Sequence, residues 1–221
     1  MIKLAAFDWN GTILADTFAV VRSQSVILRH FGFKPTNVKE FQNTYAMPIR
    51  NYWLNMGLSG KFFDKHYKDV QHLFMATYEP LESFCRTRSG SREALSWIHK
   101  KKIDTVMFSN HPEPHIHKQL RRLGLSKYFS HVLARQPHDH SLLHFRTKDI
   151  LLHKYVKSRR YKPNEVICIG DTDEEIEIGK KFRYFTVALT GGYQSTKRLR
   201  AAKPDFLIHN LNELKKIITR L

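Results

Sequence analysis

Carboxylates follow two apolar runs of this sequence at positions where they could act together. Asp8 comes directly after the run Leu4–Phe7, and a glycine-containing turn follows it. A carboxylate in this position can serve as a nucleophile or a metal ligand, although a capped turn would look the same. The run Val166–Ile169 leads into the segment 170–175, which holds four carboxylates. Carboxylates this close repel one another unless a cation joins them.

Oxygen ligands of this kind suit Mg²⁺, which binds through one or two carboxylates plus phosphate oxygen and keeps several waters. Asp173 and Glu174 have a second explanation, since acids at a helix N-terminus are favoured by the helix dipole. Ser109 and Asn110 follow another apolar run and offer small donors for an anionic oxygen, or form a plain turn. Lys148 begins a helical pattern, where it could neutralise an anion or lie on a solvated face.

Short apolar runs that alternate with helical patterns must position these residues. This alternation predicts an α/β fold, a Rossmann-like doubly wound parallel sheet, whose ligands bind beyond the carboxyl ends of the strands. The predicted strands are 4–7, 105–108, 132–134, 166–169, 185–189 and 206–208, and the predicted helices are 91–101, 114–122, 147–159 and 173–182.

The segment 16–82 breaks the alternation. Its apolar residues have the spacing of amphipathic helices, and no strand-like run separates them. We therefore predict a core domain formed by residues 1–15 and 83–221, and a helical domain formed by residues 16–82 inserted after the first strand.

In their order along the chain, these segments resemble the four motifs of the haloacid dehalogenase-like superfamily of phosphohydrolases. The resemblance covers the whole chain and is more specific to the superfamily than to a substrate. The variant Asp-Trp-Asn-Gly-Thr and the segment 187–193 also resemble phosphoglycolate phosphatase-like members. The matching residues are Asp8, Gly11 and Thr12 in the first motif, Ser109 in the second, Lys148 in the third, 23 residues before Asp171, and Gly170, Asp171, Thr172 and Glu175 in the fourth.

The resemblance implies a mechanism and a metal. Asp8 would attack the phosphorus atom of a small phosphorylated metabolite and form an aspartyl-phosphate that water hydrolyses. Mg²⁺ would be held by Asp8, the backbone carbonyl of Asn10 and Asp171. Glu175 would act on the metal through water or would orient Lys148.

The remaining roles concern the phosphoryl group and the substrate. Ser109, with backbone amides of Trp9 and Asn110, would hold the phosphoryl oxygens, Thr12 would belong to the substrate-binding set, and Lys148 would neutralise charge. The segment 16–82 falls where the family inserts a cap that closes over the site. Substrate selection is expected from cap residues such as Tyr45, Met47, Arg50 and Tyr52.

The chain departs from the family pattern at two positions. Glu175 stands in place of the commoner Asp, which lengthens its reach by one methylene. Asn10 stands in place of the Asp that protonates the leaving group and then activates water, and an amide does neither near neutral pH. The expected activity is therefore hydrolysis of a phosphomonoester such as phosphoglycolate, weakened by Asn10.

Two other functions are less favoured by the sequence. A phosphonate-cleaving relative would need a cap lysine as a Schiff base, and Lys34 and Lys39 show no sign of a desolvated setting. The net charge of +17 suggests nucleic-acid binding or processing of nucleic-acid ends. However, the basic clusters lack interleaved aromatic residues, and solvated helix ends explain them. They are Lys100–Lys102, Arg159–Arg160, Lys180–Lys181 and Lys197–Arg200.

Two groups of histidines raise the question of zinc. No cysteine accompanies them and their spacing fits no standard zinc site, so we predict surface histidines. They are His111, His115 and His117, then His138, His140 and His144.

The composition limits the class of protein. Hydrophobic residues make up 42% of the 221 positions, which suffices for a core, and the two cysteines exclude a disulfide framework. No apolar run approaches the length of a membrane span, and the N-terminal residues are too soon charged for a secretory signal. We expect a soluble, cytoplasmic protein; the sequence does not indicate its oligomeric state.

Overall fold

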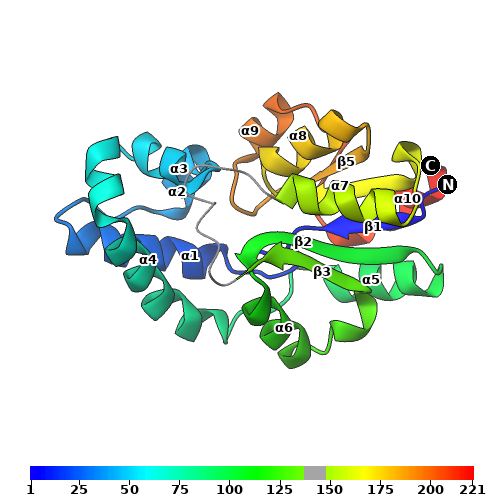
Figure 1. Ribbon diagram of the computed structural model, residues 1–221, viewed down its shortest axis with the longest axis horizontal. Coiled ribbons are helices and arrows are strands. Elements are labelled where there is room, and N and C mark those ends of the chain that lie inside the picture. Colours follow the sequence, from blue (N-terminus) through cyan, green and yellow to red (C-terminus); the bar gives the residue numbers. More distant parts are fainter. Residues whose placement is uncertain (137–147) are drawn as a thin grey trace.

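The computed structural model describes residues 1–136 and 148–221 and contains one parallel sheet (Figure 1). Its strand order is β3-β2-β1-β4-β5-β6. The strands are β1 (Leu4–Phe7), β2 (Asp104–Pro112), β3 (His131–Arg135), β4 (Val166–Gly170), β5 (Phe185–Leu189) and β6 (Phe206–Ile208). The helices that pack on the sheet are α5 (Ser91–Lys100), α6 (Glu113–Arg122), α7 (Lys148–Ser158), α8 (Asp173–Phe182), α9 (Thr196–Ala201) and α10 (Leu214–Arg220).

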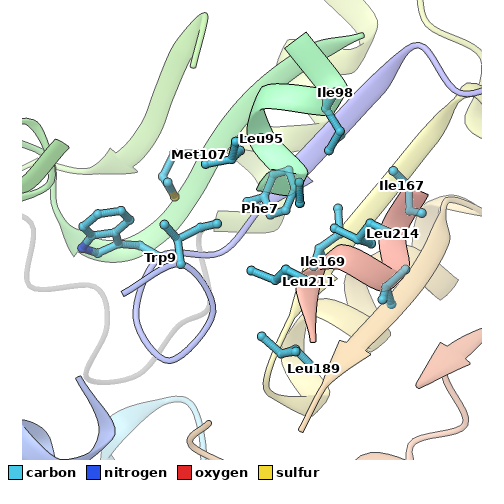
Figure 2. Close-up of a cluster of buried hydrophobic side chains, with 14 of the residues drawn as sticks. Phe7, Trp9, Leu95, Ile98, Met107, Ile167, Ile169, Leu189, Leu211 and Leu214 are labelled. Atoms are coloured by element: carbon cyan, nitrogen blue, oxygen red, sulfur yellow. The ribbon is translucent and has the colours of Figure 1, made fainter. Parts of the chain in front are cut away.

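Both faces of the sheet are covered by helices, as the apolar strands require. Ala5 and Phe7 of β1 belong to a cluster with side chains of α5, α6 and α10, part of which is drawn in Figure 2. Leu4 and Ala6 point to the other face and pack with α7 and α8. This alternation along one strand, with helices on each side, confirms the predicted Rossmann-like doubly wound fold.

The interval between β1 and β2 contains helices and no strand among the described residues. Besides α5, the helices there are α1 (Thr17–His30), α2 (Val38–Thr44), α3 (Ile49–Asn55) and α4 (Gly60–Glu82), and these four lie to one side of the sheet in Figure 1. They bury a hydrophobic cluster of their own, to which Tyr193 of the core also contributes. The domain boundaries at residues 15 and 82 remain a prediction; below we call α1 to α4 the helical insertion.

The second strand differs from the prediction. It extends from Asp104 to Pro112 and passes through Ser109, where the predicted strand had already ended. Its pairing with β3 shifts register between Ser109 and Pro112, so the continuous pattern of side chains is interrupted there. His111 consequently lies in this strand. No helix in the described part of the chain is long and apolar enough to span a membrane.

Candidate active site

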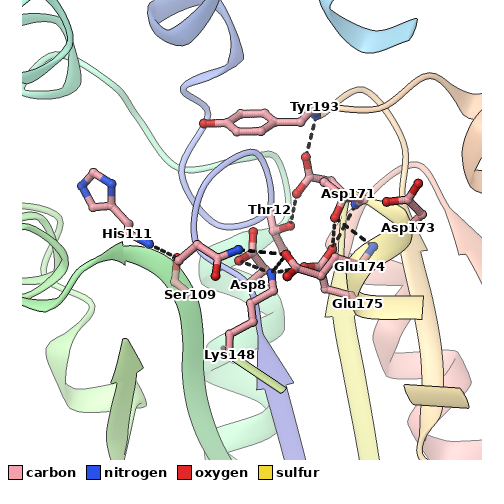
Figure 3. Close-up of polar contacts among 12 residues, drawn as sticks. Asp8, Thr12, Ser109, His111, Lys148, Asp171, Asp173, Glu174, Glu175 and Tyr193 are labelled. Carbon is pink, nitrogen blue, oxygen red and sulfur yellow. Dashed lines mark hydrogen bonds and ion pairs between the residues drawn. The ribbon is translucent and has the colours of Figure 1, made fainter. Parts of the chain in front are cut away.

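The strand order brings the predicted site residues to one edge of the sheet. Because β1 lies between β2 and β4, the carboxyl ends of these three parallel strands meet there. Asp8 follows β1, Ser109 lies in the last part of β2 and Asp171 follows β4. Lys148, the first residue of α7, reaches the same edge, and Figure 3 shows it pointing at the carboxylates.

Lys148 is buried among three carboxylates. Its Nζ lies 3.3 Å from Asp8 Oδ1 and 3.1 Å from Glu174 Oε2, and it also donates to Glu175 Oε1. Burial by itself would lower the pKa of Lys148, but the three negative charges outweigh it and hold the pKa well above its ordinary value. The lysine is therefore charged and ties Asp8 to Glu174 and Glu175 of the segment after β4.

Negative charge exceeds positive charge at this edge. Burial raises the pKa of Asp8 well above its ordinary value, and Lys148 offsets this only in part. Burial, followed by the charge of Glu175, raises the pKa of Asp171 to about 7. Buried carboxylates whose charged forms are this poorly compensated are typical of a site that takes up a cation.

Asp171 is fixed by the loops around it. Its oxygens accept hydrogen bonds from Thr12 Oγ1, at 2.6 Å, and from the backbone N–H of Tyr193. A Cβ at Gly11, whose φ is +73°, or at Gly192 would collide with this carboxylate. Thr12 was predicted among the substrate-binding residues; in the structure it is fully buried and its hydroxyl donates to Asp171.

Both carboxylate oxygens of Glu175 accept hydrogen bonds from other residues of the protein. Oε1 accepts from Lys148, while Oε2 accepts from the Thr172 N–H and hydroxyl at 3.1 and 2.7 Å, closing the capping box of α8. Of the two roles foreseen for Glu175, these contacts favour orienting Lys148. Glu174, for which the helix dipole offered a sufficient explanation, also belongs to the site: its Oε2 accepts from Asn110 Nδ2 at 2.8 Å.

Asn10 is held by a carboxylate that sequence reasoning missed. Its Nδ2 donates to Asp16 Oδ2 at 2.7 Å and to the Tyr78 hydroxyl at 2.9 Å. Asp16 is fully buried and also accepts from the hydroxyls of Tyr78 and Tyr193 and from the Gly11 N–H. Burial raises the pKa of Asp16, and these donors offset the shift in part. From sequence, Asp16 resembles an ordinary residue preceding a helix.

Other residues shape the loop after β1. Trp9 packs its fully buried side chain into the core, and its carbonyl accepts the N–H groups of Thr12, Ile13 and Leu14. Arg88, also missed from the sequence, donates to the carbonyls of Gly11 at 2.9 Å and Thr190 at 2.6 Å. It thereby ties the loops after β1 and β5 together.

A cavity of ≈ 200 Å³ opens onto the carboxylates from the helical insertion. Tyr45 and Met47 line it, as predicted for substrate selection. Arg50 does not line it and pairs with Asp64 at 3.0 Å, and Tyr52 is buried in the cluster of the insertion. The lining from the insertion is mostly apolar or aromatic: Val20, Ile27, Tyr45, Met47, Ile49, Trp53, Phe63, Tyr67, Val70, Phe74, Met75 and Tyr78, with Gln24 and Gln71.

Ser109 and Asn110 both line this cavity, as do Asp8, Asn10 and Lys148. The Ser109 hydroxyl accepts from the His111 N–H at 3.2 Å, which leaves its own proton for a ligand oxygen. Asp171 and Trp9 contribute no surface to the cavity in the described structure.

The histidines divide into different environments. His117 is 46% exposed and fits the prediction of a surface residue. The prediction does not hold for His111, whose side chain is only 9% exposed, because β2 carries it under α4. His138, His140 and His144 lie outside the described residues.

The sequence matches the haloacid dehalogenase-like hydrolases over residues 2–183. Phosphoglycolate phosphatase of Synechococcus elongatus is 24% identical over 215 residues, covering 97% of this chain and 96% of that protein. Phosphoglycolate phosphatase of Pseudomonas fluorescens is 22% identical, covering 96% of this chain and 78% of that protein.

Solved structures agree on the fold. A predicted phosphatase from Clostridium acetobutylicum superposes with a TM-score of 0.83 at 17% identity, over 100% of both chains. A haloacid dehalogenase-like hydrolase from Streptococcus pneumoniae gives 0.81 at 15% identity, over 98% of both chains. The predicted family and enzyme class are confirmed: this chain belongs to the haloacid dehalogenase-like hydrolases.

Proposed function

We propose that this hydrolase is a Mg²⁺-dependent phosphomonoesterase that works through an aspartyl-phosphate at Asp8. The observation that carries the proposal is the position of the Asp8 carboxylate. It lines the cavity, its Oδ1 is 3.3 Å from a buried lysine, and Ser109 on the neighbouring strand lines the same cavity. A nucleophile, a cation and a hydroxyl donor around one space suit phosphoryl transfer.

The carboxylates present fit Mg²⁺. Asp8 and Asp171 are buried oxygen donors whose pKa values are raised, and Gly11 and Gly192 leave the room that the Asp171 carboxylate occupies. Asp8, Asp171 and the backbone carbonyl of Asn10 would hold the ion. When bound, it would offset the charge of the carboxylates and of a phosphoryl group.

The chain's own residues account for the positioning. Lys148 holds Asp8 and would neutralise the incoming phosphoryl charge, while Glu175 fixes Lys148 in turn. Ser109 would donate to a phosphoryl oxygen. Thr12 and the Tyr193 N–H hold Asp171 in place. The backbone amides of Trp9 and Asn110 stay proposed as further donors to the phosphoryl group.

The substrate we propose has an apolar or aromatic body and a leaving group that departs without a proton. The curated relatives are phosphoglycolate phosphatases, so phosphoglycolate remains the reference substrate. Its carboxylate would enter a space whose described cationic lining consists of Arg135 and Lys148, and Lys148 already faces three carboxylates. Burying a carboxylate without a partner is costly, whereas an aromatic body suits the apolar walls.

The proposal is tested by phosphate release from phenyl phosphate, glycerol phosphate and phosphoglycolate, with Mg²⁺ and with EDTA. D8N should abolish release while the protein remains folded. D69N is the matched control, because Asp69 is 68% exposed on α4 and should leave the rate unchanged. Equal rates with EDTA, or full activity of D8N, would contradict the proposal.

The phosphonate-cleaving alternative has no candidate Schiff base in its predicted positions. Lys34 and Lys39 are exposed, and neither lines the cavity. Borohydride with an aldehyde substrate should therefore trap no adduct. The basic clusters predicted to be solvated helix ends are largely exposed, so we do not propose nucleic acid as the substrate.

A further inference from the structure

A second group of ligand-type side chains lies where α4 meets the core. Glu82 at the C-terminal end of α4, His111 in β2 and His115 in α6 bring a carboxylate oxygen and two imidazole nitrogens within 4.8 Å of one another. The side chains of Glu82 and His111 are only 2% and 9% exposed. His111 also lines the cavity described above, but Figure 3 shows its ring pointing away from Asp8 and Lys148, so these three ligand atoms form a group distinct from the carboxylates.

The two buried members face each other at ion-pair distance but form no hydrogen bond with each other. Glu82 Oε1 and His111 Nε2 make no hydrogen bond within the described residues, although they lie 3.3 Å apart. The other oxygen of Glu82 accepts from Gln119 Nε2 at 3.2 Å. No lysine or arginine of the described chain forms an ion pair with the Glu82 carboxylate. Buried polar atoms are rarely left in this way unless the site has a further function.

The donor set and its spacing indicate a class of ion. Two imidazoles with one carboxylate are typical of Zn²⁺ and related transition metals, while Mg²⁺ prefers oxygen ligands. In a tetrahedral shell with bonds of about 2.0–2.1 Å, neighbouring ligand atoms lie about 3.3 Å apart. The separation of Glu82 Oε1 and His111 Nε2 matches this edge, and His115 is near enough to supply the third ligand.

We propose that Glu82, His111 and His115 bind one divalent transition-metal ion of the Zn²⁺ class. Glu79 Oε1, 3.5 Å from His115 Nε2, orients that imidazole through its second nitrogen or adds a ligand. Because Glu82 ends the helical insertion while His111 and His115 belong to the core, the ion ties α4 to β2 and α6. The His111 ring also packs edge-on against Tyr78, which contacts Asn10, so the ion lies one side chain from the catalytic loop.

The test is Zn²⁺ binding to untagged, chelator-treated protein, measured by competition with a chromophoric chelator in excess Mg²⁺. One equivalent should bind to the parent protein. Loss of an outer-shell partner alone costs roughly 10–100-fold in affinity, so H115A should weaken binding by at least about 100-fold. His115 is 27% exposed, so its replacement should leave the fold intact, which its melting temperature checks.

Two further variants distinguish Zn²⁺ binding at this group from binding to exposed histidines or to the carboxylates. H117A removes an exposed histidine of the same helix and should bind Zn²⁺ like the parent. D171N alters the carboxylate site and should also retain the ion. No binding by the parent, or binding unchanged in H115A, would overturn the proposal, and loss in D171N alone would assign the ion to the carboxylates. Because the readout is binding, failure here leaves the proposed phosphatase function untouched.

Discussion

Replacing Asn10 by Asp tests whether the site lacks a general acid that protonates the leaving group. The amide nitrogen of Asn10 lies 2.7 Å from Asp16 Oδ2. A second carboxylate at that distance would interact with Asp16 by about 6 kcal/mol at an effective dielectric constant of 20. This corresponds to roughly four pKa units, so the pair in N10D should share one proton at neutral pH.

The shared proton should raise the rate of hydrolysis mainly for substrates whose leaving group must be protonated. A positioned general acid contributes roughly 10²–10⁴-fold when the leaving group needs a proton. N10D should therefore raise kcat for glycerol phosphate by at least about 100-fold, yet raise kcat for p-nitrophenyl phosphate less than about tenfold. The assay is steady-state phosphate release for both substrates across pH.

Two controls interpret the result. N10A removes the amide without adding a carboxyl group and should gain nothing on glycerol phosphate. Adding D16N to N10D removes the like charge, so the alkaline limb of the rate profile should move to lower pH. A gain of the same size on both substrates, or no gain on glycerol phosphate, would refute the reasoning.

Three further changes have expected outcomes. K148M should lower the free energy of unfolding by about 3–5 kcal/mol, because it leaves buried carboxylates without their cation. The control K181M replaces a side chain that is 60% exposed and should change the free energy of unfolding little. Similar urea midpoints for the two variants would contradict this expectation. Burial, with nearby acidic charge, raises the pKa of Cys85 to about 11, so iodoacetamide should label it about two orders of magnitude more slowly at pH 8 than an unperturbed thiol, and faster with each pH unit up to that pKa. Q71R places a cation in the cavity wall and should raise kcat/KM for phosphoglycolate relative to phenyl phosphate by about tenfold; an unchanged ratio would mean that the cavity does not select substrate.

The fold was predictable because local patterns determine it. Buried parallel strands are continuous apolar runs, and five of the six predicted strands agree with the structure to within a residue at each end. Asp8 and Asp171 could be placed together because they follow such runs and because neighbouring parallel strands end at one edge. The sheet therefore supplied the geometry that the motifs alone lack.

The parts of the site that the sequence did not predict depend on contacts between segments far apart in the chain. Asp16 meets Tyr78 and Tyr193, which are 62 and 177 residues further along the chain, and no local pattern reports this. The group of Glu82 and His111 likewise needs the docking of α4 onto β2. His111 was predicted at the surface because no cysteine accompanies it and its spacing fits no standard zinc site, and the extension of β2 to Pro112 was not foreseen.

The central claim is that Asp8 carries the phosphoryl group during turnover. It is tested most directly by rapid acid quench of the protein with p-nitrophenyl phosphate and Mg²⁺, followed by mass spectrometry of its peptides. Because Asn10 activates water poorly, the intermediate should accumulate. We predict one added phosphoryl group, labile to hydroxylamine, on the peptide containing Asp8, and none in D8N. Steady turnover with no phosphoryl group on Asp8 at any quench time would contradict the account.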